Sequence, residues 1–315
     1  MSQADRTTGA YSDPQYTVVW GANNIYTLRH SSGDLINHTR IKGKLLNVAE
    51  DEYSNVLVPG DTVELDASGD LIRARGERRN VLKRWNPTRK RVQAIAANVD
   101  RVLVLASQRD PAYRPGFVAR VLAMAEIEGV TAIPVLTKSD LPANPVADRD
   151  LASLTAAGYQ PRRVSSATGE LADLVQLTRH GTTVMIGQSG VGKSSCINAL
   201  AGDALLQVGA LSRSKGRGRH TTTLARAVYL THGSGVVVDT PGIREFLIKM
   251  YAATEIAYGF REFQRFIPDC RMPSCLHLHE PGCAVLAALN DGTIDPARYD
   301  HYRSALGDLE LGGTP

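Results

Sequence analysis

Eight consecutive residues have the types and spacing of a phosphate-binding loop. They match the pattern G-x-x-x-x-G-K-[ST] in full and are Gly187, Gln188, Ser189, Gly190, Val191, Gly192, Lys193 and Ser194. An apolar run at 182–186 precedes them and a helical pattern at 195–200 follows, so backbone N–H groups at a helix N-terminus can converge on phosphate. We expect Lys193 to reach the β- and γ-phosphates, Ser194 to bind Mg²⁺ through its hydroxyl, and Ser195 to join the nucleotide contacts.

A second motif follows the phosphate loop at the end of another apolar run. Residues 239–242 read Asp-Thr-Pro-Gly, which fits D-x-x-G. We expect Asp239 to hold Mg²⁺ through water and the Gly242 N–H to contact the γ-phosphate. D-x-x-G by itself is a weak signal, because strands often end in Asp followed by a Pro-Gly turn. At this distance after a phosphate loop it becomes a strong one.

The motif at 137–140, Thr-Lys-Ser-Asp, has the features of a guanine-reading loop. The Asp140 carboxylate can accept hydrogen bonds from N1–H and the exocyclic amine of guanine, a donor pair that adenine lacks. Thr137 stands where Asn is more usual, and Lys138 completes the motif. We therefore expect GTP as the ligand. The loop expected to close over the base contains Ser165, Ser166 and Ala167.

The order of these motifs is rotated, because the base-reading motif precedes the phosphate loop. Chain order does not prevent a common site, since ligands of open α/β sheets bind at the carboxyl ends of the strands, whichever strand comes first. The rotation places D-x-x-G, and the segment between it and the phosphate loop, at the C-terminal end of the nucleotide-binding domain.

The residue after D-x-x-G is Ile243, where Ras-like GTPases have a Gln that orients the attacking water. Because the Ile243 side chain cannot hydrogen-bond, either the water is oriented from elsewhere or the intrinsic rate is very low. His220, in the Gly-rich basic loop at 212–223, is the candidate. The alternative is that His220 binds RNA phosphate with its arginine neighbours. Thr222 is the expected Mg²⁺-binding threonine of that loop, with Thr221 and Thr223 as alternatives.

Three cysteines and a histidine lie close together near the C-terminus. Cys270, Cys275, His277 and Cys283 provide the Cys₃His set of a closed tetrahedral zinc site, with no coordination position left for water. We therefore expect one structural Zn²⁺. On spacing alone His279 competes for the fourth position, and ordinary buried cysteines are the alternative to any metal. Cys196, on the helix after the phosphate loop, is expected to be a small core residue.

The elements that position these motifs suggest several domains. Residues 15–85 carry candidate strands at 41–46, 55–58, 62–65 and 70–75, which favours a small β-barrel. An OB-type barrel fits this pattern, and other small barrels fit it almost as well. Residues 86–247 alternate apolar runs at 101–106, 132–136, 182–186 and 235–239 with helical patterns such as 117–127, which predicts a doubly wound parallel sheet. Residues 248–315 combine helical stretches with the Cys/His cluster, and 1–14 are expected to be a flexible tail.

The charge pattern favours a polyanionic partner more than the formal net charge of +4 does. Basic residues gather in two stretches, Arg73, Arg75, Arg78, Arg79, Lys83, Arg84, Arg89, Lys90 and Arg91, and Arg213, Lys215, Arg217 and Arg219. Solvated strand faces and loops are the alternative interpretation. No segment has the ~20 apolar residues that span a bilayer. The N-terminal residues have no apolar signal core, so we expect a soluble cytoplasmic protein without a membrane partner, and a monomer by default.

The rotated motif order, the N-terminal barrel and the Cys/His segment together resemble the ribosome small-subunit-dependent GTPase A family (RsgA, also called YjeQ), whose GTPase domain is circularly permuted. The resemblance spans nearly the whole chain, including 59–61, 97–100, the nucleotide motifs, 218–223, 239–246 and 270–283. It implies an OB-fold, a permuted GTPase domain and a zinc domain. It also implies rRNA binding in late maturation of the small ribosomal subunit, hydrolysis of GTP to GDP stimulated by that subunit, and release on hydrolysis. It favours His277 over His279 and matches His220 to the family's switch histidine.

Three other functions stay open on the sequence. A signalling switch with a protein effector is disfavoured by the basic stretches. A P-loop ATPase or small-molecule kinase is disfavoured by Asp140. A zinc-dependent hydrolase is the weakest alternative, because the expected metal site has no open position.

Overall fold

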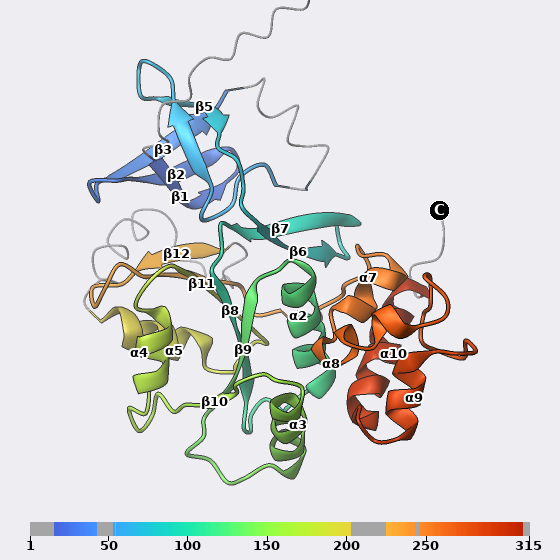
Figure 1. The fold of residues 1–315 in the computed structure, drawn as a ribbon. Helices are drawn as coiled ribbons and strands as arrows, with labels where there is room; N and C mark the ends of the chain where they lie inside the picture. Colours follow the sequence, from blue (N-terminus) through green and yellow to red (C-terminus); the bar gives the residue numbers. More distant parts are fainter. Residues whose placement is uncertain (1–15, 43–52, 54, 203–224, 244–245, 311–315) are drawn as a thin grey trace, which may run out of the picture.

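The computed structural model describes residues 16–42, 53, 55–202, 225–243 and 246–310. His220, Thr222, the basic residues at 213–219 and most of the strand expected at 41–46 lie outside the described residues. The described chain forms an N-terminal barrel, a central six-stranded sheet flanked by helices, and a C-terminal group of helices packed beside it (Figure 1).

Five short strands close the N-terminal barrel. They are β1 (Tyr16–Ala22), β2 (Ile25–His30), β3 (Leu35–Ile41), β4 (Thr62–Leu65) and β5 (Leu71–Arg75), paired in the order β1-β2-β3-β5-β4 with β4 returning to β1. Alternating side chains such as Val18, Leu28 and Ile72 are fully buried inside it. The predicted small barrel is confirmed, and β4 and β5 match the predicted strands at 62–65 and 70–75.

The strand predicted at 55–58 is wrong. These residues form a loop, although Val56, Leu57 and Val58 are buried as a strand's would be. The Asn55 carboxamide takes the place of strand pairing, because it donates to the Ala94 carbonyl (2.8 Å) and accepts from the Ala94 N–H (2.9 Å). The buried Asp61 carboxylate satisfies the Val58 N–H (2.8 Å).

A separate hairpin, β6 (Val81–Asn86) and β7 (Arg91–Ala97), lies between the barrel and the central sheet (Figure 1). The predicted domain boundary at 85/86 falls within this hairpin. Its base is joined to the barrel, because Ala97 N–H donates to the Pro59 carbonyl (3.0 Å) and a Cβ on Gly60 would lie 2.1 Å from the Ala97 oxygen. Only glycine fits at residue 60, which also has φ +91°.

The central sheet has the order β10-β9-β8-β11-β13-β12. Its strands are β8 (Arg101–Ser107), β9 (Thr131–Thr137), β10 (Arg162–Arg163), β11 (Thr182–Gly187), β12 (Arg226–Tyr229) and β13 (Val236–Asp239). Five of these strands are parallel, as the predicted doubly wound parallel sheet requires, whereas the edge strand β12, which was not predicted, runs antiparallel to β13.

Helices cover both faces of the sheet, as a doubly wound fold requires. Along β8, Val102 and Val104 pack toward α2 (Pro115–Ile127) and α3 (Pro145–Ala156). The alternate residues Leu103 and Leu105 pack toward α4 (Ala172–Thr178) and α5 (Lys193–Ala201). This alternation explains why β8 is an unbroken apolar run in the sequence.

The C-terminal helices pack against α2 and share its hydrophobic core. They are α7 (Ala253–Tyr258), α8 (Arg261–Gln264), the 3₁₀ turn η1 (Ile267–Asp269), α9 (Ala284–Asn290) and α10 (Pro296–Glu310). Two arginines fix α10 in place: Arg120 of α2 pairs with Asp308 (2.7 Å), and the buried Arg298 pairs with Glu262 of α8 (2.6 Å). The predicted helical C-terminal part is confirmed.

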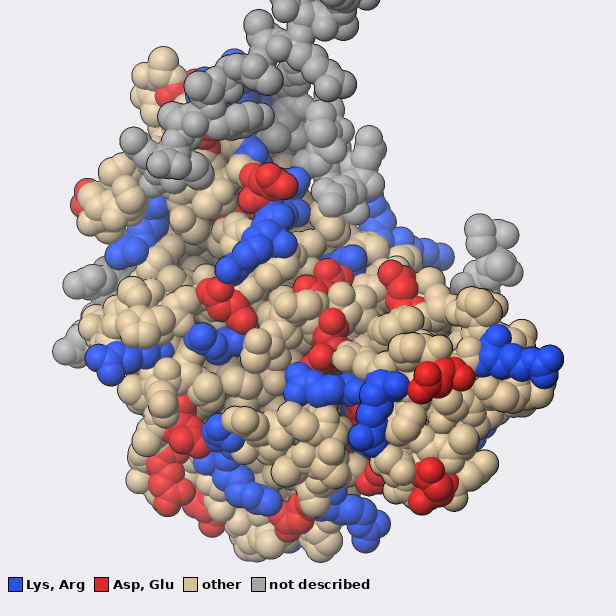
Figure 2. Space-filling model, in the orientation of Figure 1, with Lys and Arg blue, Asp and Glu red and all other residues tan. Residues whose placement is uncertain are grey.

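Several residues of the first basic stretch form ion pairs with acidic residues of the same molecule. Arg78 is buried against the Asp61 carboxylate (2.7 Å), Arg79 pairs with Asp100 (2.6 Å), and Lys83 pairs with Glu128 (3.0 Å). On the face drawn in Figure 2, basic and acidic side chains are interspersed. Among the described residues, no helix is both long enough and apolar enough to cross a bilayer.

Candidate nucleotide and metal sites

The phosphate loop leaves the centre of the sheet. It joins β11, which lies between β8 and β13, to α5, whose first residue is Lys193. Gly190 and Gly192 have φ of +83° and +91°, which turn the chain sharply before the helix. Lys193, Ser194 and Ser195 therefore occupy the first turn of α5, where free backbone N–H groups favour an anion.

Lys193 and Asp239 lie near enough at this loop to shift each other's pKa. Burial lowers the pKa of Lys193, and the nearby Asp239 opposes that shift. Burial raises the pKa of Asp239, opposed by Lys193 and by Arg226 on the facing strand. Asp239 Oδ1 is enclosed without a hydrogen-bond partner among the described residues. This buried acceptor fits the role expected of Asp239, because a hydrated Mg²⁺ would supply the missing donor.

The D-x-x-G turn packs directly on the phosphate loop. A Cβ on Gly242 would lie 2.8 Å from Ser189 Cα, so only glycine allows this approach. The Ile243 N–H donates to the Gly187 carbonyl (3.2 Å), and the Thr240 hydroxyl donates to the Met185 carbonyl (2.7 Å). Ile243 is 4% exposed and packs into the core. Its side chain therefore offers no group to a water molecule.

The base-reading motif is tied to the phosphate loop by Thr137, the last residue of β9. Its buried hydroxyl lies 2.5 Å from the Val191 carbonyl and 3.2 Å from the Ala106 carbonyl. Thr137 stands where Asn is more usual in this motif, and its shorter side chain still joins the two loops. Lys138, with φ +55°, turns back so that its ammonium group bonds the Asp110 carbonyl.

Ser165 holds the Asp140 carboxylate. Its fully buried hydroxyl donates to Asp140 Oδ1 (2.5 Å) and accepts from the N–H groups of Ala167 and Thr168, both at 3.2 Å. Ser166 and Ala167 are exposed in the turn that follows. The structure therefore brings together the two loops that the sequence assigns to the base.

Sequence reasoning missed the loop that follows β8. Arg109 donates to the Pro142 and Ala143 carbonyls (both 2.9 Å), and the Asn144 carboxamide donates to the Gln108 carbonyl (2.9 Å). These bonds brace the chain just after Asp140. The available signal was a polar run directly after an apolar strand, next in the sheet to the strand that carries Asp140.

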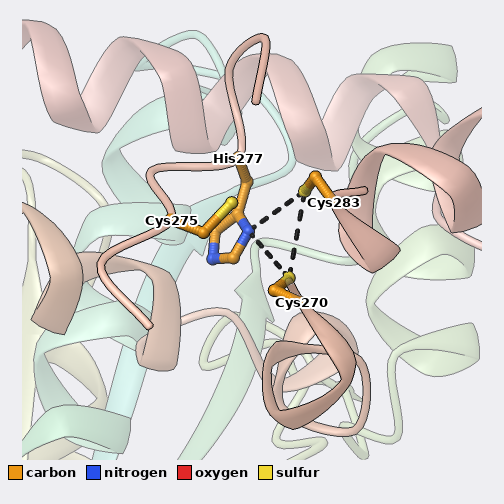
Figure 3. A group of neighbouring side chains, drawn as sticks. All are labelled: Cys270, Cys275, His277 and Cys283. Carbon is orange, nitrogen blue, oxygen red and sulfur yellow. Dashed lines mark hydrogen bonds between the residues drawn. The ribbon is translucent and has the colours of Figure 1, made fainter. Parts of the chain in front are cut away.

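The Cys/His cluster gathers four ligand atoms within 4.8 Å of one another (Figure 3). His277 Nδ1 lies 3.6 Å from Cys270 Sγ and 3.3 Å from Cys283 Sγ, and the two sulfurs are 4.0 Å apart. Zn–S bonds of about 2.3 Å in a tetrahedron place two sulfurs roughly 3.8 Å apart. The cluster could therefore hold a zinc ion, whereas the competing His279 is exposed and is not part of it.

Buried polar groups hold the loop that presents His277. The Tyr299 hydroxyl donates to the His277 carbonyl (2.7 Å), and the Tyr302 hydroxyl donates to the Leu276 carbonyl (2.6 Å). Partial burial raises the pKa of Glu280, but hydrogen bonds from the backbone N–H groups around it lower that pKa to about 2 overall. Helix α10, which carries both tyrosines, thus positions the cluster.

Comparisons with known proteins agree with this geometry. A family model described as RsgA GTPase matches residues 75–249. A small ribosomal subunit biogenesis GTPase RsgA from Borreliella afzelii (strain PKo) is 36% identical over 300 residues, covering 94% of this chain and 96% of that protein. The structure of YjeQ from Thermotoga maritima has a TM-score of 0.71 at 27% identity, over 95% of this chain and 99% of that one. YloQ, a circularly permuted GTPase, gives 0.68 at 23% identity over 99% and 100% of the two chains, which is a likeness in fold.

Proposed function

The chain belongs to the RsgA GTPase family, and from that premise we propose that it hydrolyses GTP in the biogenesis of the small ribosomal subunit. One observation carries the enzymatic part. The Thr137 hydroxyl, 2.5 Å from the Val191 carbonyl, joins the loop that carries Asp140 to the loop that cradles phosphate. A loop that recognises guanine and a loop that binds phosphate, held in a fixed position relative to each other, would select GTP over other nucleotides.

The nucleotide would be held by residues of five loops at the carboxyl edge of the sheet. Asp140, braced by Ser165, reads the base, and Lys138 lies beside it. The backbone of residues 187–192 and the first turn of α5 bind the phosphates, and Gly242 meets the γ-phosphate. Ser194, Asp239 and Thr222 would hold Mg²⁺, which neutralises charge on the phosphates when bound. Asp239 Oδ1, which has no partner among the described residues, supports this assignment.

Water activation would fall to His220. The buried Ile243 side chain leaves the usual water-orienting position without a polar group. The neutral His220 imidazole would accept a hydrogen bond from the water and orient it toward the γ-phosphate. His220 belongs to the basic segment that precedes β12 in the sequence, and docking of that segment on rRNA would bring it into place.

The Cys/His cluster would hold one structural Zn²⁺ through Cys270, Cys275, His277 and Cys283. Three thiolates and one imidazole fill a tetrahedral shell, so the ion would stabilise the fold and leave no position for substrate. The packing of the C-terminal helices on α2 supports a structural role, because loss of the cluster would loosen a shared core.

The partners follow from the family. Relatives are named for biogenesis of the small ribosomal subunit, and we infer that this chain binds that subunit and its rRNA, is stimulated by it, and leaves on hydrolysis. The exposed basic residues at the tip of the β6–β7 hairpin support contact with RNA. A cytoplasmic monomer is the working state.

Turnover measurements test the proposal. GTP hydrolysis by the purified protein is measured with and without small ribosomal subunits, and with ATP and large subunits as controls. We expect large stimulation that is specific to GTP and to the small subunit. Tight GTP binding without any stimulation would leave the nucleotide site in place but overturn the ribosomal role.

His220→Ala tests the assignment of the water-orienting group. We expect subunit-stimulated turnover to fall about 100-fold or more, which is the usual contribution of a general base, while GTP affinity stays within about threefold. The matched control is His232→Ala, which removes a histidine between β12 and β13. Unchanged stimulated turnover in His220→Ala would assign the role to a ribosomal group.

A further inference from the structure

A cavity of about 340 Å³ lies where the barrel, the β6–β7 hairpin and the D-x-x-G turn meet. Its volume falls in the range of small-ligand sites, which starts at roughly 300 Å³. The barrel contributes the β1–β2 turn at 21–24 and the loop at 55–59, the hairpin contributes Arg84, Arg89 and Gln93, and the GTPase domain contributes Thr240, Pro241 and Ile243. None of the residues with a role in the nucleotide or metal sites above, other than those of the D-x-x-G turn, borders it.

The charge of the lining favours an anion. Its described residues include Arg84 and Arg89 and no carboxylate. Arg84 is half-buried, and its partner among the described residues is the neutral Gln93 carboxamide oxygen (3.3 Å to Nε and 3.1 Å to Nη2). Burial lowers the pKa of Arg84, a sign that the cation has lost water without gaining a counter-ion. A guanidinium with five N–H donors and one neutral partner is suited to a phosphate.

The rest of the lining favours a ligand with both apolar and polar parts. Val56, Leu57, Pro59 and Ile95 give apolar surface, and Pro241 and Ile243 add to it. At the rim, Asn23 and Asn24 form a turn with φ of +49° and +61°. The Asn24 carboxamide oxygen accepts from the Ile41 N–H (3.1 Å), and within the described part of the chain its NH₂ group has no partner.

We propose that this cavity binds a nucleoside monophosphate unit, with its phosphate at Arg84 and Arg89 and its base against the apolar wall, and that this binding is coupled to the nucleotide at the phosphate loop. Two sources supply this chemistry: a free nucleotide, or an unpaired residue of an RNA strand. The RNA source rests on the proposed function, whereas the free nucleotide does not.

The coupling follows from the floor of the cavity. Thr240, Pro241 and Ile243 face the cavity, and the same turn is bonded to the phosphate-loop strand through Thr240 to Met185 and Ile243 to Gly187. The other walls are held by hydrogen bonds that do not involve this turn, between Asn55 and Ala94 and between the Ala97 N–H and the Pro59 carbonyl. A shift of the floor with the bound nucleotide therefore changes the cavity, and by linkage a cavity ligand changes nucleotide affinity by the same factor.

Fluorescence titration tests the binding. The only tryptophans of the chain, Trp20 and Trp85, adjoin the lining residues Gly21 and Arg84. With the phosphate loop saturated by GDP, the protein is titrated with CMP, with UMP and with single-stranded oligouridine. We expect saturable quenching that Arg84→Gln weakens about tenfold or more, as loss of a charge-assisted contact does. Arg89→Gln, at the exposed hairpin tip, is the second variant and should weaken it severalfold.

Arg73→Gln is the matched control, because Arg73 belongs to the same basic stretch but pairs with Glu64 on the barrel. Saturation by CMP or UMP identifies a free nucleotide as a ligand, and saturation by oligouridine alone identifies RNA. Equal affinity in Arg84→Gln and Arg73→Gln, or no saturation by any probe, would overturn the site. GDP affinity that is the same with and without the bound probe would overturn the coupling. Subunit-stimulated turnover of the same preparation is measured separately, so a failed cavity is distinguishable from a failed ribosomal function.

Discussion

The nucleotide site and the metal cluster are built in opposite ways. The candidate nucleotide site draws on loops that follow β9, β10, β11 and β13, and its described residues extend from 137 to 242 along the chain. The Cys/His cluster takes all four candidate metal ligands from residues 270–283. The first site exists because a sheet brings distant segments to one edge, whereas the second needs only a short loop and the helix that supports it.

The two sites also differ in what holds them together without a ligand. At the nucleotide site, hydrogen bonds such as Thr137 to Val191 and Ser165 to Asp140 fix the loops. At the cluster, the candidate ligands meet one another. Burial raises the pKa of Cys275 to about 12 and also raises that of Cys283, whereas a bound metal ion requires thiolates. Loss of a bound metal ion should therefore destabilise the cluster much more than loss of a bound nucleotide destabilises the nucleotide site.

Removal of one cluster ligand gives the largest expected effect. Cys283→Ser should abolish binding of the single Zn²⁺ and cost metal-linked folding free energy on the order of 10 kcal/mol, the scale measured for structural zinc in small domains. The C-terminal helices should then unfold at a much lower temperature. Elemental analysis and thermal unfolding followed by circular dichroism measure both changes.

His279→Ala is the control for that experiment, because His279 is exposed two residues from His277 and is not part of the cluster. It should keep the zinc and the unfolding temperature. Full zinc content in Cys283→Ser, or its loss in His279→Ala, would show that the ligands are assigned wrongly. GDP affinity should change little in either variant if the sheet alone supports the nucleotide site.

The next largest effect is expected at Asp140. Asp140→Asn removes the carboxylate that accepts two guanine donors, and an unpaired buried donor is costly, so GTP affinity should fall about 100-fold or more. Xanthine carries an oxygen where guanine has the amine, and the amide introduced by the substitution can donate to that oxygen. Binding of xanthosine triphosphate should therefore improve while GTP binding falls, as measured by equilibrium titration. Equal losses for both nucleotides would point to a damaged loop instead of an altered base reader.

The same contrast explains what the sequence could predict. Fixed spacing within one loop specifies the phosphate loop, Asp239 and the Cys/His cluster, because the local backbone alone decides where those groups point. The phosphate loop and Asp239 follow apolar strands, and β8, β9, β11 and β13 all follow the predictions closely. The family resemblance supplied the barrel's type and the ribosomal role.

Features that depend on which groups hydrogen-bond or form ion pairs with one another could not be predicted from the sequence. Residues 55–58 look like a strand, yet the Asn55 side chain replaces the pairing with β7. The β6–β7 hairpin and the antiparallel β12–β13 pair join strands that are neighbours in the sequence, yet β6, β7 and β12 were not predicted as strands. The basic stretch at 73–91 favoured a polyanionic partner on the sequence, but Asp61 and Asp100 neutralise two of its arginines. Only tertiary contacts decide which charges stay exposed.

Substitution of Thr137 gives the smallest expected effect and is the most specific test of whether hydrogen bonds hold the nucleotide site together. Thr137→Val keeps the size of the side chain but removes the hydroxyl between the base-reading motif and the phosphate loop, leaving the Val191 carbonyl without that donor. A lost buried hydrogen bond costs about 1 kcal/mol, so GDP affinity should fall roughly fivefold. Thr137→Ser keeps the hydroxyl and should bind GDP nearly as the natural chain does. If the two variants weaken binding equally, packing and not the hydrogen bond joins the loops, and the nucleotide site is held in the same way as the core beneath it.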